Sequence, residues 1–123
     1  MPIARINDHD MYYEVLGKGD SILCMGGWGT FAHDNHHHLA RGLTDRYQVI
    51  LFDYRGICDS SDDLSIPSTM QLHAADAIAL LDHLKLKNVH LMGLVGIGAC
   101  VCQEIAMQRP DLARSMLNMG AWC

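Results

Sequence analysis

The sequence has few basic residues. Its 123 residues contain nine Lys and Arg against fourteen Asp and Glu, which gives a formal net charge of -5. A protein that binds nucleic acid or an anionic membrane through its overall charge has the opposite balance. We therefore expect neither nucleic acid nor a membrane surface as the main partner.

Long hydrophobic runs are also absent. The longest apolar stretch, residues 89–102, contains His90 and is shorter than the ~20 residues that a membrane-spanning helix needs. No apolar run follows Arg5, the one basic residue near the N-terminus, as it would in a signal peptide. The five cysteines form no C-x-x-C motif and no paired spacing, which is typical of reduced thiols. These absences predict a cytoplasmic protein.

The composition that remains is that of a single globular domain over residues 1–123. Half of the residues are apolar, so the chain can bury a core. Short β-rich segments alternate with segments of helical periodicity, and the β-rich segments are too continuously apolar to have one wet face. This pattern predicts an α/β fold, a mostly parallel sheet with helices on both faces. The expected strands are 11–16, 21–25, 48–53, 89–92 and 115–119. The expected helices are 74–84, with Ser68 or Thr69 as its cap, 98–109 and, more weakly, 33–46.

Three glycine-bearing turns follow expected strands, where sites gather in open α/β sheets. Glycines in residues 26–29 let backbone N–H groups converge on an anion, as an oxyanion hole requires. Taken alone, they are more typical of a plain tight turn with Trp28 as a packing aromatic. Residues 53–56 either take a direct part in the chemistry of the site or form an Arg–Asp loop that braces the turn. Residues 92–98 join a strand to a helix and suit a nucleophile elbow or a phosphate cradle.

Taken in order, these segments resemble the α/β-hydrolase superfamily from about residue 11 to residue 123. The run 52–61 is most similar to the branch of cofactor-free haloperoxidase-like esterases and enol-lactone hydrolases. The resemblance implies the N-terminal half of that fold, from about strand 1 or 2 to strand 6. It also implies that the chain ends near the usual cap insertion point and that no cofactor is needed.

The resemblance also implies roles for individual residues. Gly27 and Trp28 match the oxyanion loop, with the second donor being the N–H after the nucleophile. The family motif G-x-S-x-G places either Val95 or Gly96 at the nucleophile position, depending on the alignment register. Neither residue carries a nucleophile, so this chain alone is predicted to be inactive. Gly96 and Ile97 are expected to line the substrate pocket.

Two other groups of side chains could act as a nucleophile or as metal ligands. Cys100 and Cys102 follow the elbow, but Cys102 falls on the apolar stripe of its helix, which favours a buried structural thiol. His33 and His37 are four residues apart, as in some helical metal sites. Only Asp34 is near enough to complete a ligand set, so a solvated helix start is favoured and no metal is expected. The histidine run consists of His33, His36, His37 and His38.

The family places its catalytic acid and histidine beyond the sixth strand, and no residue of this chain matches them. We therefore expect completion by a second polypeptide or C-terminal fragment, or a homo-oligomer, because the last strand is an apolar edge. The predicted activity is hydrolysis of a small ester, lactone or activated C–C bond.

Two alternatives remain open. A hydrolase scaffold without a nucleophile can be a non-catalytic protein that binds a small apolar ligand. The glycines Gly93, Gly96 and Gly98 also resemble the turn of an NAD(P)-binding oxidoreductase, although one residue short and after the wrong strand.

Overall fold

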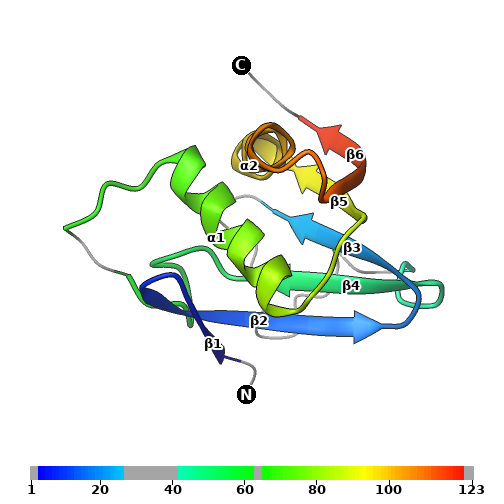
Figure 1. Cartoon of the computed structure of the whole chain (residues 1–123), viewed down its shortest axis with the longest axis horizontal. Helices are drawn as coiled ribbons and strands as arrows, with labels where there is room; N and C mark the ends of the chain where they lie inside the picture. Colours follow the sequence, from blue (N-terminus) through cyan, green and yellow to red (C-terminus); the bar gives the residue numbers. More distant parts are fainter. Residues whose placement is uncertain (1–2, 27–41, 63–64, 121–123) are drawn as a thin grey trace.

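The computed structural model describes residues 3–26, 42–62 and 65–120, which form one sheet and two helices (Figure 1). The strands are β1 (Ile3–Ile6), β2 (His9–Gly17), β3 (Asp20–Met25), β4 (Tyr47–Phe52), β5 (Val89–Leu94) and β6 (Ala113–Met119). The helices are α1 (Met70–His83) and α2 (Val95–Gln108).

The strands form a six-stranded sheet in the order β1-β2-β4-β3-β5-β6. β1 and β2 pair antiparallel, as do β2 and β4, whereas β4, β3, β5 and β6 run parallel. Strand order reverses around β3, because the chain moves from β3 to β4 on one side and then to β5 on the other. The predicted mostly parallel α/β sheet is confirmed.

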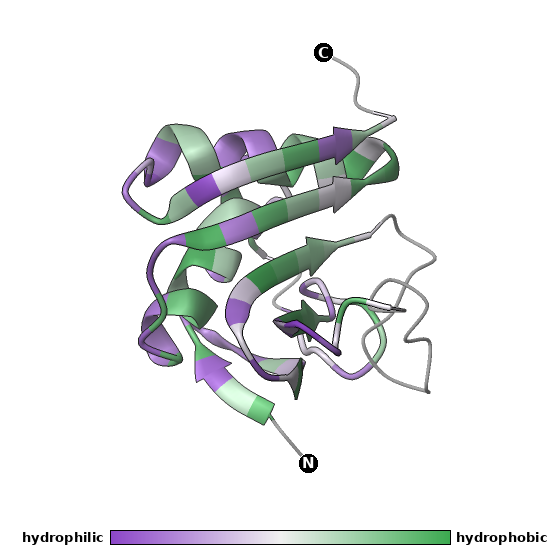
Figure 2. Cartoon of the chain, turned by 90° about the vertical axis from the view of Figure 1, so that its right-hand side faces the viewer, coloured by the Kyte–Doolittle hydropathy of each residue, from purple (hydrophilic) through white to green (hydrophobic). Residues whose placement is uncertain are grey.

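Both described helices pack on one face of the sheet. The main core cluster joins Leu23, Ile50 and Leu91 of the central strands to Leu81 of α1 and Ile105 of α2, all of which are almost fully buried. Burying apolar area of this kind stabilises the fold by roughly 25 cal/mol per Å². β3, in the middle of the sheet, begins with two polar residues and is apolar and buried over its remaining four (Figure 2).

A second cluster occupies the opposite face. Its buried members are Tyr12, Ile22, Cys24, Val49 and Leu51. Of the helix predicted for residues 33–46, residues 33–41 lie outside the described ranges, and the remaining part forms a turn that leads into β4. No helix in the described ranges is long and apolar enough to cross a bilayer.

The helix boundaries have local causes. α1 begins at Met70, directly after Thr69, one of the two caps expected for it, whose hydroxyl accepts from the Leu72 N–H at 3.1 Å. α2 begins at Val95, not at residue 98, since the turn after β5 leads directly into the helix. β1 was not expected at all, because its short exposed–buried alternation is weak in the sequence.

Candidate functional site

The sharpest turn near the carboxyl ends of the parallel strands lies between β5 and α2. Leu94 has an extended backbone (φ -117°, ψ 136°), Val95 has φ 56°, and Gly96 has φ 23° and ψ -90°. A positive φ is costly for any residue with a β-carbon and unusual for a β-branched one. The Val95 side chain is 66% exposed. Val95 and Gly96 thus form the strand-to-helix turn together, and Val95 is the exposed residue of the two.

Two glycines let α2 start close to the sheet. A β-carbon on Gly98 would lie 2.2 Å from the Met25 carbonyl oxygen, and one on Gly93 would lie 2.5 Å from the Gly98 carbonyl oxygen. Any side chain at these positions would push the helix away from the ends of β3 and β5. The glycine spacing that suggested a phosphate cradle is therefore explained by packing of the helix on the strands.

The backbone N–H of Gly96, the residue after Val95, already makes a hydrogen bond. Gly96 N donates to the carbonyl oxygen of Gly120 at 3.2 Å. The family resemblance implies that the second oxyanion donor is the N–H after the nucleophile, which is that of Gly96 when Val95 holds the nucleophile position. In this conformation the carbonyl oxygen of Gly120, just after β6, accepts from that N–H, so the N–H is not available to an oxyanion.

The other expected oxyanion residues, Gly27 and Trp28, lie outside the described residues. The residue before them, Gly26, is described and is buried. Its carbonyl oxygen accepts from the Tyr54 hydroxyl at 2.9 Å. Burial raises the pKa of Tyr54, so this phenol stays protonated and keeps donating at neutral pH.

The loop after β4 is built around a buried arginine. Arg55 Nε and Nη2 donate to the two carboxylate oxygens of Asp76 in α1, each at 3.0 Å. Nη2 also donates to Asp8 in the turn between β1 and β2 at 3.0 Å, and Asn7 donates to Asp76 at 2.8 Å. This arrangement is the bracing Arg–Asp loop that the sequence left open, and its partner Asp76 was not identified there.

Two buried histidines near this network were missed by sequence reasoning. His9 and His73 are each 1% exposed. His9 Nε2 lies 4.0 Å from Asp76, and His73 Nε2 lies 3.1 Å from the Ser68 hydroxyl. Burial lowers the pKa of both imidazoles, with the nearby Asp76 opposing the shift. The sequence could not indicate this proximity, because 64 residues separate the two histidines and each stands alone in its segment.

The thiol of Cys102 is poorly suited as an alternative nucleophile at this turn. Cys102 is fully buried in α2, and burial raises the pKa of its thiol to about 12. Ile97 is buried in the main core cluster. The histidine run at residues 33–38 lies outside the described part of the chain, and the described residues contain no cluster that could hold a metal ion.

Comparison with known proteins agrees with this architecture. A family model described as alpha/beta hydrolase fold matches residues 20–123. The chain is 33% identical over 122 residues to RutD of Azorhizobium caulinodans, which is named for a carbamate hydrolase activity; the match covers 99% of this chain and 45% of RutD. It is 27% identical to the pyrrolizixenacetamide deacetylase of Xenorhabdus hominickii, covering 97% of this chain and 44% of the deacetylase.

Solved structures of other proteins share the fold of this chain. The enol-lactonase of Burkholderia xenovorans superposes with a TM-score of 0.80 at 22% identity, covering 94% of this chain and 45% of that structure. The chain therefore spans less than half the length of these relatives.

Proposed function

Because the chain belongs to the α/β-hydrolase fold family, we propose that it is the N-terminal part of a hydrolase for a small ester, lactone or activated C–C bond. The catalytic acid and histidine come from a second polypeptide or C-terminal fragment. The observation that carries this proposal is the strained turn at Val95, between β5 and α2, where the family places its nucleophile.

Valine cannot attack a carbonyl, so the proposed chemistry has no covalent intermediate at this turn. Instead, a histidine of the complementing part takes a proton from water, and the resulting hydroxide attacks the substrate carbonyl carbon. Backbone N–H groups of Trp28 and Gly96 stabilise the developing oxyanion. The bond between carbonyl carbon and leaving group then breaks, and the leaving group takes up the proton.

The edge of the sheet supports the need for a partner. β6 pairs only with β5 among the described strands, and its other edge has no strand beside it. Met116, Leu117 and Met119 are each about half exposed on this strand. An apolar edge strand is a template for pairing with another chain. We therefore expect β6 to be the first contact with the complementing polypeptide.

The test is purification of the tagged chain from its source, followed by sequencing of any polypeptide that co-purifies in stoichiometric amount. The expected partner carries an Asp or Glu and, later, a His after predicted strands, and the complex hydrolyses an activated ester without a burst. If the pure chain is monomeric and unfolds cooperatively, the partner requirement is wrong. An acyl-enzyme burst would contradict the non-covalent mechanism.

A second function is favoured by the bond between Gly96 and Gly120. With that oxyanion donor occupied, the scaffold suits a non-catalytic protein that binds a small apolar ligand. Turnover of any ester by the complex would exclude this alternative. The dinucleotide alternative has less support, because Gly93 and Gly98 are explained by helix packing; fluorescence titration with NADH tests it directly.

A further inference from the structure

The loop that begins at Gly26 needs a restraint from another part of the fold. Residues 26, 27 and 29 are glycine, the residue that limits the backbone least. The proposed function uses the Trp28 N–H as an oxyanion donor, and such a donor is effective only when its position is fixed before the reaction. The glycines do not fix that position, so a contact with a neighbouring element has to do so.

The Tyr54 side chain makes such a contact at the start of the loop. Tyr54 is buried, and its hydroxyl donates to the Gly26 carbonyl oxygen at 2.9 Å. The start of α2 also comes close, because a β-carbon on Gly98 would lie 2.9 Å from the same carbonyl oxygen. Since a peptide unit is planar, the bond from Tyr54 sets the direction in which the chain leaves β3.

Tyr54 is itself held in place by its neighbours. Its ring lies edge-on to the Phe52 ring, with centroids 5.3 Å apart and planes at 79°, and near the His73 ring, with centroids 5.2 Å apart and planes at 66°. His73 Nε2 in turn lies 3.1 Å from the Ser68 hydroxyl, ahead of α1. The next residue in the chain, Arg55, is anchored by its buried ion pair with α1. The Tyr54 hydroxyl therefore reaches Gly26 from a fixed position.

We propose that Tyr54 is a positioning residue for the oxyanion donor in the loop after β3. Tyr54 does not touch the substrate in this role. Its hydroxyl holds the Gly26 carbonyl, and the Gly26 carbonyl sets the course of the loop that carries the Trp28 N–H. The role rests on the proposed function, because it concerns the same oxyanion. The groups that hold Tyr54 all belong to the described part of this chain, so the role does not depend on which polypeptide completes the site.

The test compares Tyr54→Phe with the parent, each in complex with the complementing polypeptide. The substrates are p-nitrophenyl acetate and its thionoester, in which sulfur replaces the carbonyl oxygen. Sulfur is larger and a weaker hydrogen-bond acceptor, so an oxyanion hole stabilises its anion less well. Tyr54→Phe is expected to lower kcat for the ester about a hundredfold with KM unchanged, as misplacement of a group that acts in the transition state does. The kcat for the thionoester should fall much less, so the ratio of the two kcat values falls.

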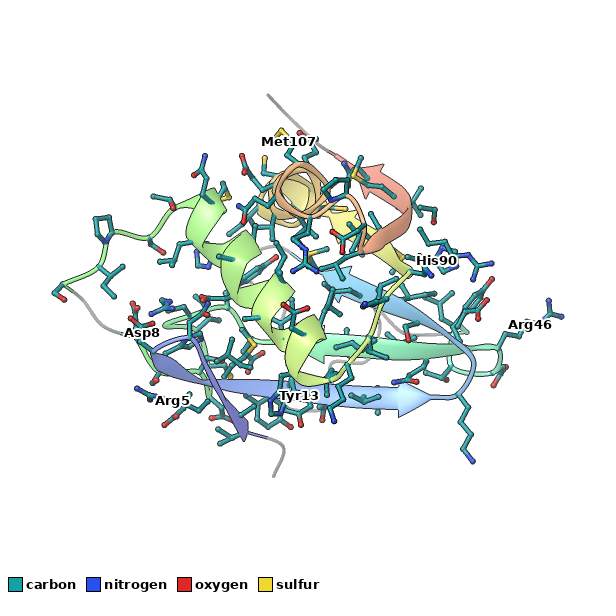
Figure 3. The ribbon with its side chains drawn as sticks, in the orientation of Figure 1. Arg5, Asp8, Tyr13, Arg46, His90 and Met107 are labelled. Carbon is teal, nitrogen blue, oxygen red and sulfur yellow. The ribbon has the colours of Figure 1, made fainter. Side chains whose placement is uncertain are left out.

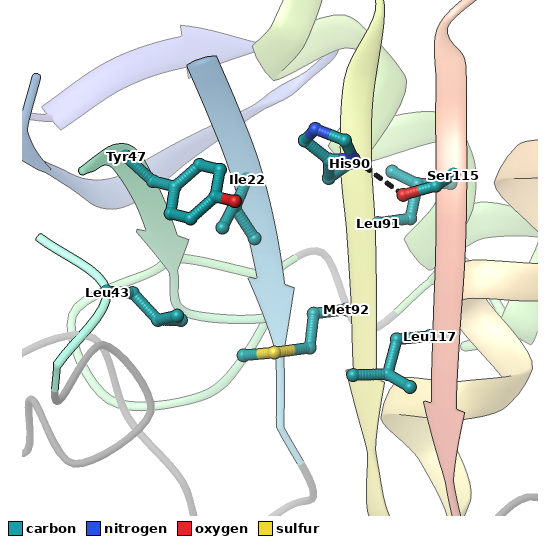
Figure 4. A pocket seen from close by; sticks show the side chains of 8 residues that line it. All are labelled: Ile22, Leu43, Tyr47, His90, Leu91, Met92, Ser115 and Leu117. Atoms are coloured by element: carbon teal, nitrogen blue, oxygen red, sulfur yellow. Dashed lines mark hydrogen bonds between the residues drawn. The ribbon is translucent and has the colours of Figure 1, made fainter. Parts of the chain in front are cut away.

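Tyr47→Phe is the matched control. The Tyr47 ring also lies edge-on to a histidine ring, that of His90, with centroids 6.1 Å apart and planes at 86° (Figure 4). Tyr47 is the first residue of β4, whereas Tyr54 follows the end of that strand. Figure 3 shows the two ends on opposite sides of the molecule, with Arg46 directly before Tyr47 and Asp8 against the loop that contains Tyr54. Tyr47→Phe should keep both kcat values and their ratio.

A structural role alone gives a different result, because partial unfolding lowers both kcat values by the same factor and leaves their ratio unchanged. An unchanged ratio in Tyr54→Phe, with an active parent complex, would overturn the positioning role and leave the proposed function standing. A parent complex that hydrolyses neither substrate would overturn both. If Tyr54→Phe does not fold, Phe52→Leu serves the same comparison: it loosens the Tyr54 ring but keeps the hydroxyl, and the ratio should fall by a smaller factor.

Discussion

The backbone N–H of Gly96 donates to the carbonyl oxygen of Gly120 at 3.2 Å, which joins the turn after β5 to the end of β6. The two segments belong to neighbouring parallel strands, so their ends meet at the same edge of the sheet. An oxyanion hole that uses the Gly96 N–H requires this bond to open. In the proposed mechanism, the residue after β6 therefore has to release the Gly96 N–H before an oxyanion can bind there.

Val95 itself should be replaceable with a gain in stability. Its φ of 56° costs a β-branched residue about 1–2 kcal/mol, whereas asparagine adopts this conformation readily. We expect Val95→Asn to raise the free energy of unfolding by about 1 kcal/mol, measured by urea denaturation. Val15→Asn is the control, because Val15 is also exposed but lies in extended β2. A gain no larger than that of the control would show that Val95 is not strained.

Removing the carboxylate of Asp76 should be strongly destabilising. Asp76 and Arg55 side chains are 2% and 1% exposed, so Asp76→Ala leaves a buried guanidinium with only the exposed Asp8 as its partner. Breaking a buried pair from one side costs about 3–5 kcal/mol. Urea denaturation measures this loss.

The matched control for Asp76→Ala is Asp10→Ala. Asp10 pairs with Arg5 at 3.1 Å, but both side chains are more than half exposed. Such surface pairs contribute about 0–1 kcal/mol. Equal losses in the two variants would contradict a bracing role for the buried network.

The sequence predicted those elements that patterns of neighbouring residues determine. The apolar runs of β3, β4 and β5, the Thr69 cap and the Arg55 loop all follow from neighbouring residues. The contact between Arg55 and Asp76 could not be predicted, because their 21 residues of separation are bridged only when α1 packs on the sheet. The sequence left Val95 and Gly96 as equal candidates for the elbow. Both have a positive φ in the structure, 56° at Val95 and 23° at Gly96, but only Val95 is exposed.

Stability should fall on mild acidification because of His9 and His73. Burial lowers the pKa of both below the ordinary value of 6.5, so the unfolded chain binds more protons than the folded one just below that pH. Their contribution is complete above pH 6.5 and decreases as the pH falls, by up to about 1.4 kcal/mol per pH unit for each histidine.

Urea denaturation between pH 7.5 and 5.5 checks this dependence. His9→Gln should reduce the slope of the unfolding free energy with pH. His83→Gln should retain it, because His83 is exposed at the end of α1. An unchanged slope in His9→Gln would exclude His9 as a source of the dependence.

A methyl group at Gly98 should separate α2 from the sheet. It would lie 2.2 Å from the Met25 carbonyl oxygen, and a backbone atom cannot yield as a flexible side chain does. We expect Gly98→Ala to lower the free energy of unfolding by roughly 2–3 kcal/mol. Gly42→Ala is the control: a methyl group there meets nothing within 4 Å, so only its positive φ of 79° adds a cost of about 1 kcal/mol.

The thiols of Cys24 and Cys102 should resist alkylation in the folded chain. Both are buried, and burial raises the pKa of each to about 12, so neither forms appreciable thiolate at pH 8. Cys58 is exposed in the loop after β4 and should react before these two. Peptide mass mapping after timed iodoacetamide treatment resolves the sites, and urea should make them equally reactive. Rapid modification of Cys102 without urea would return it as a candidate nucleophile beside the Val95 turn.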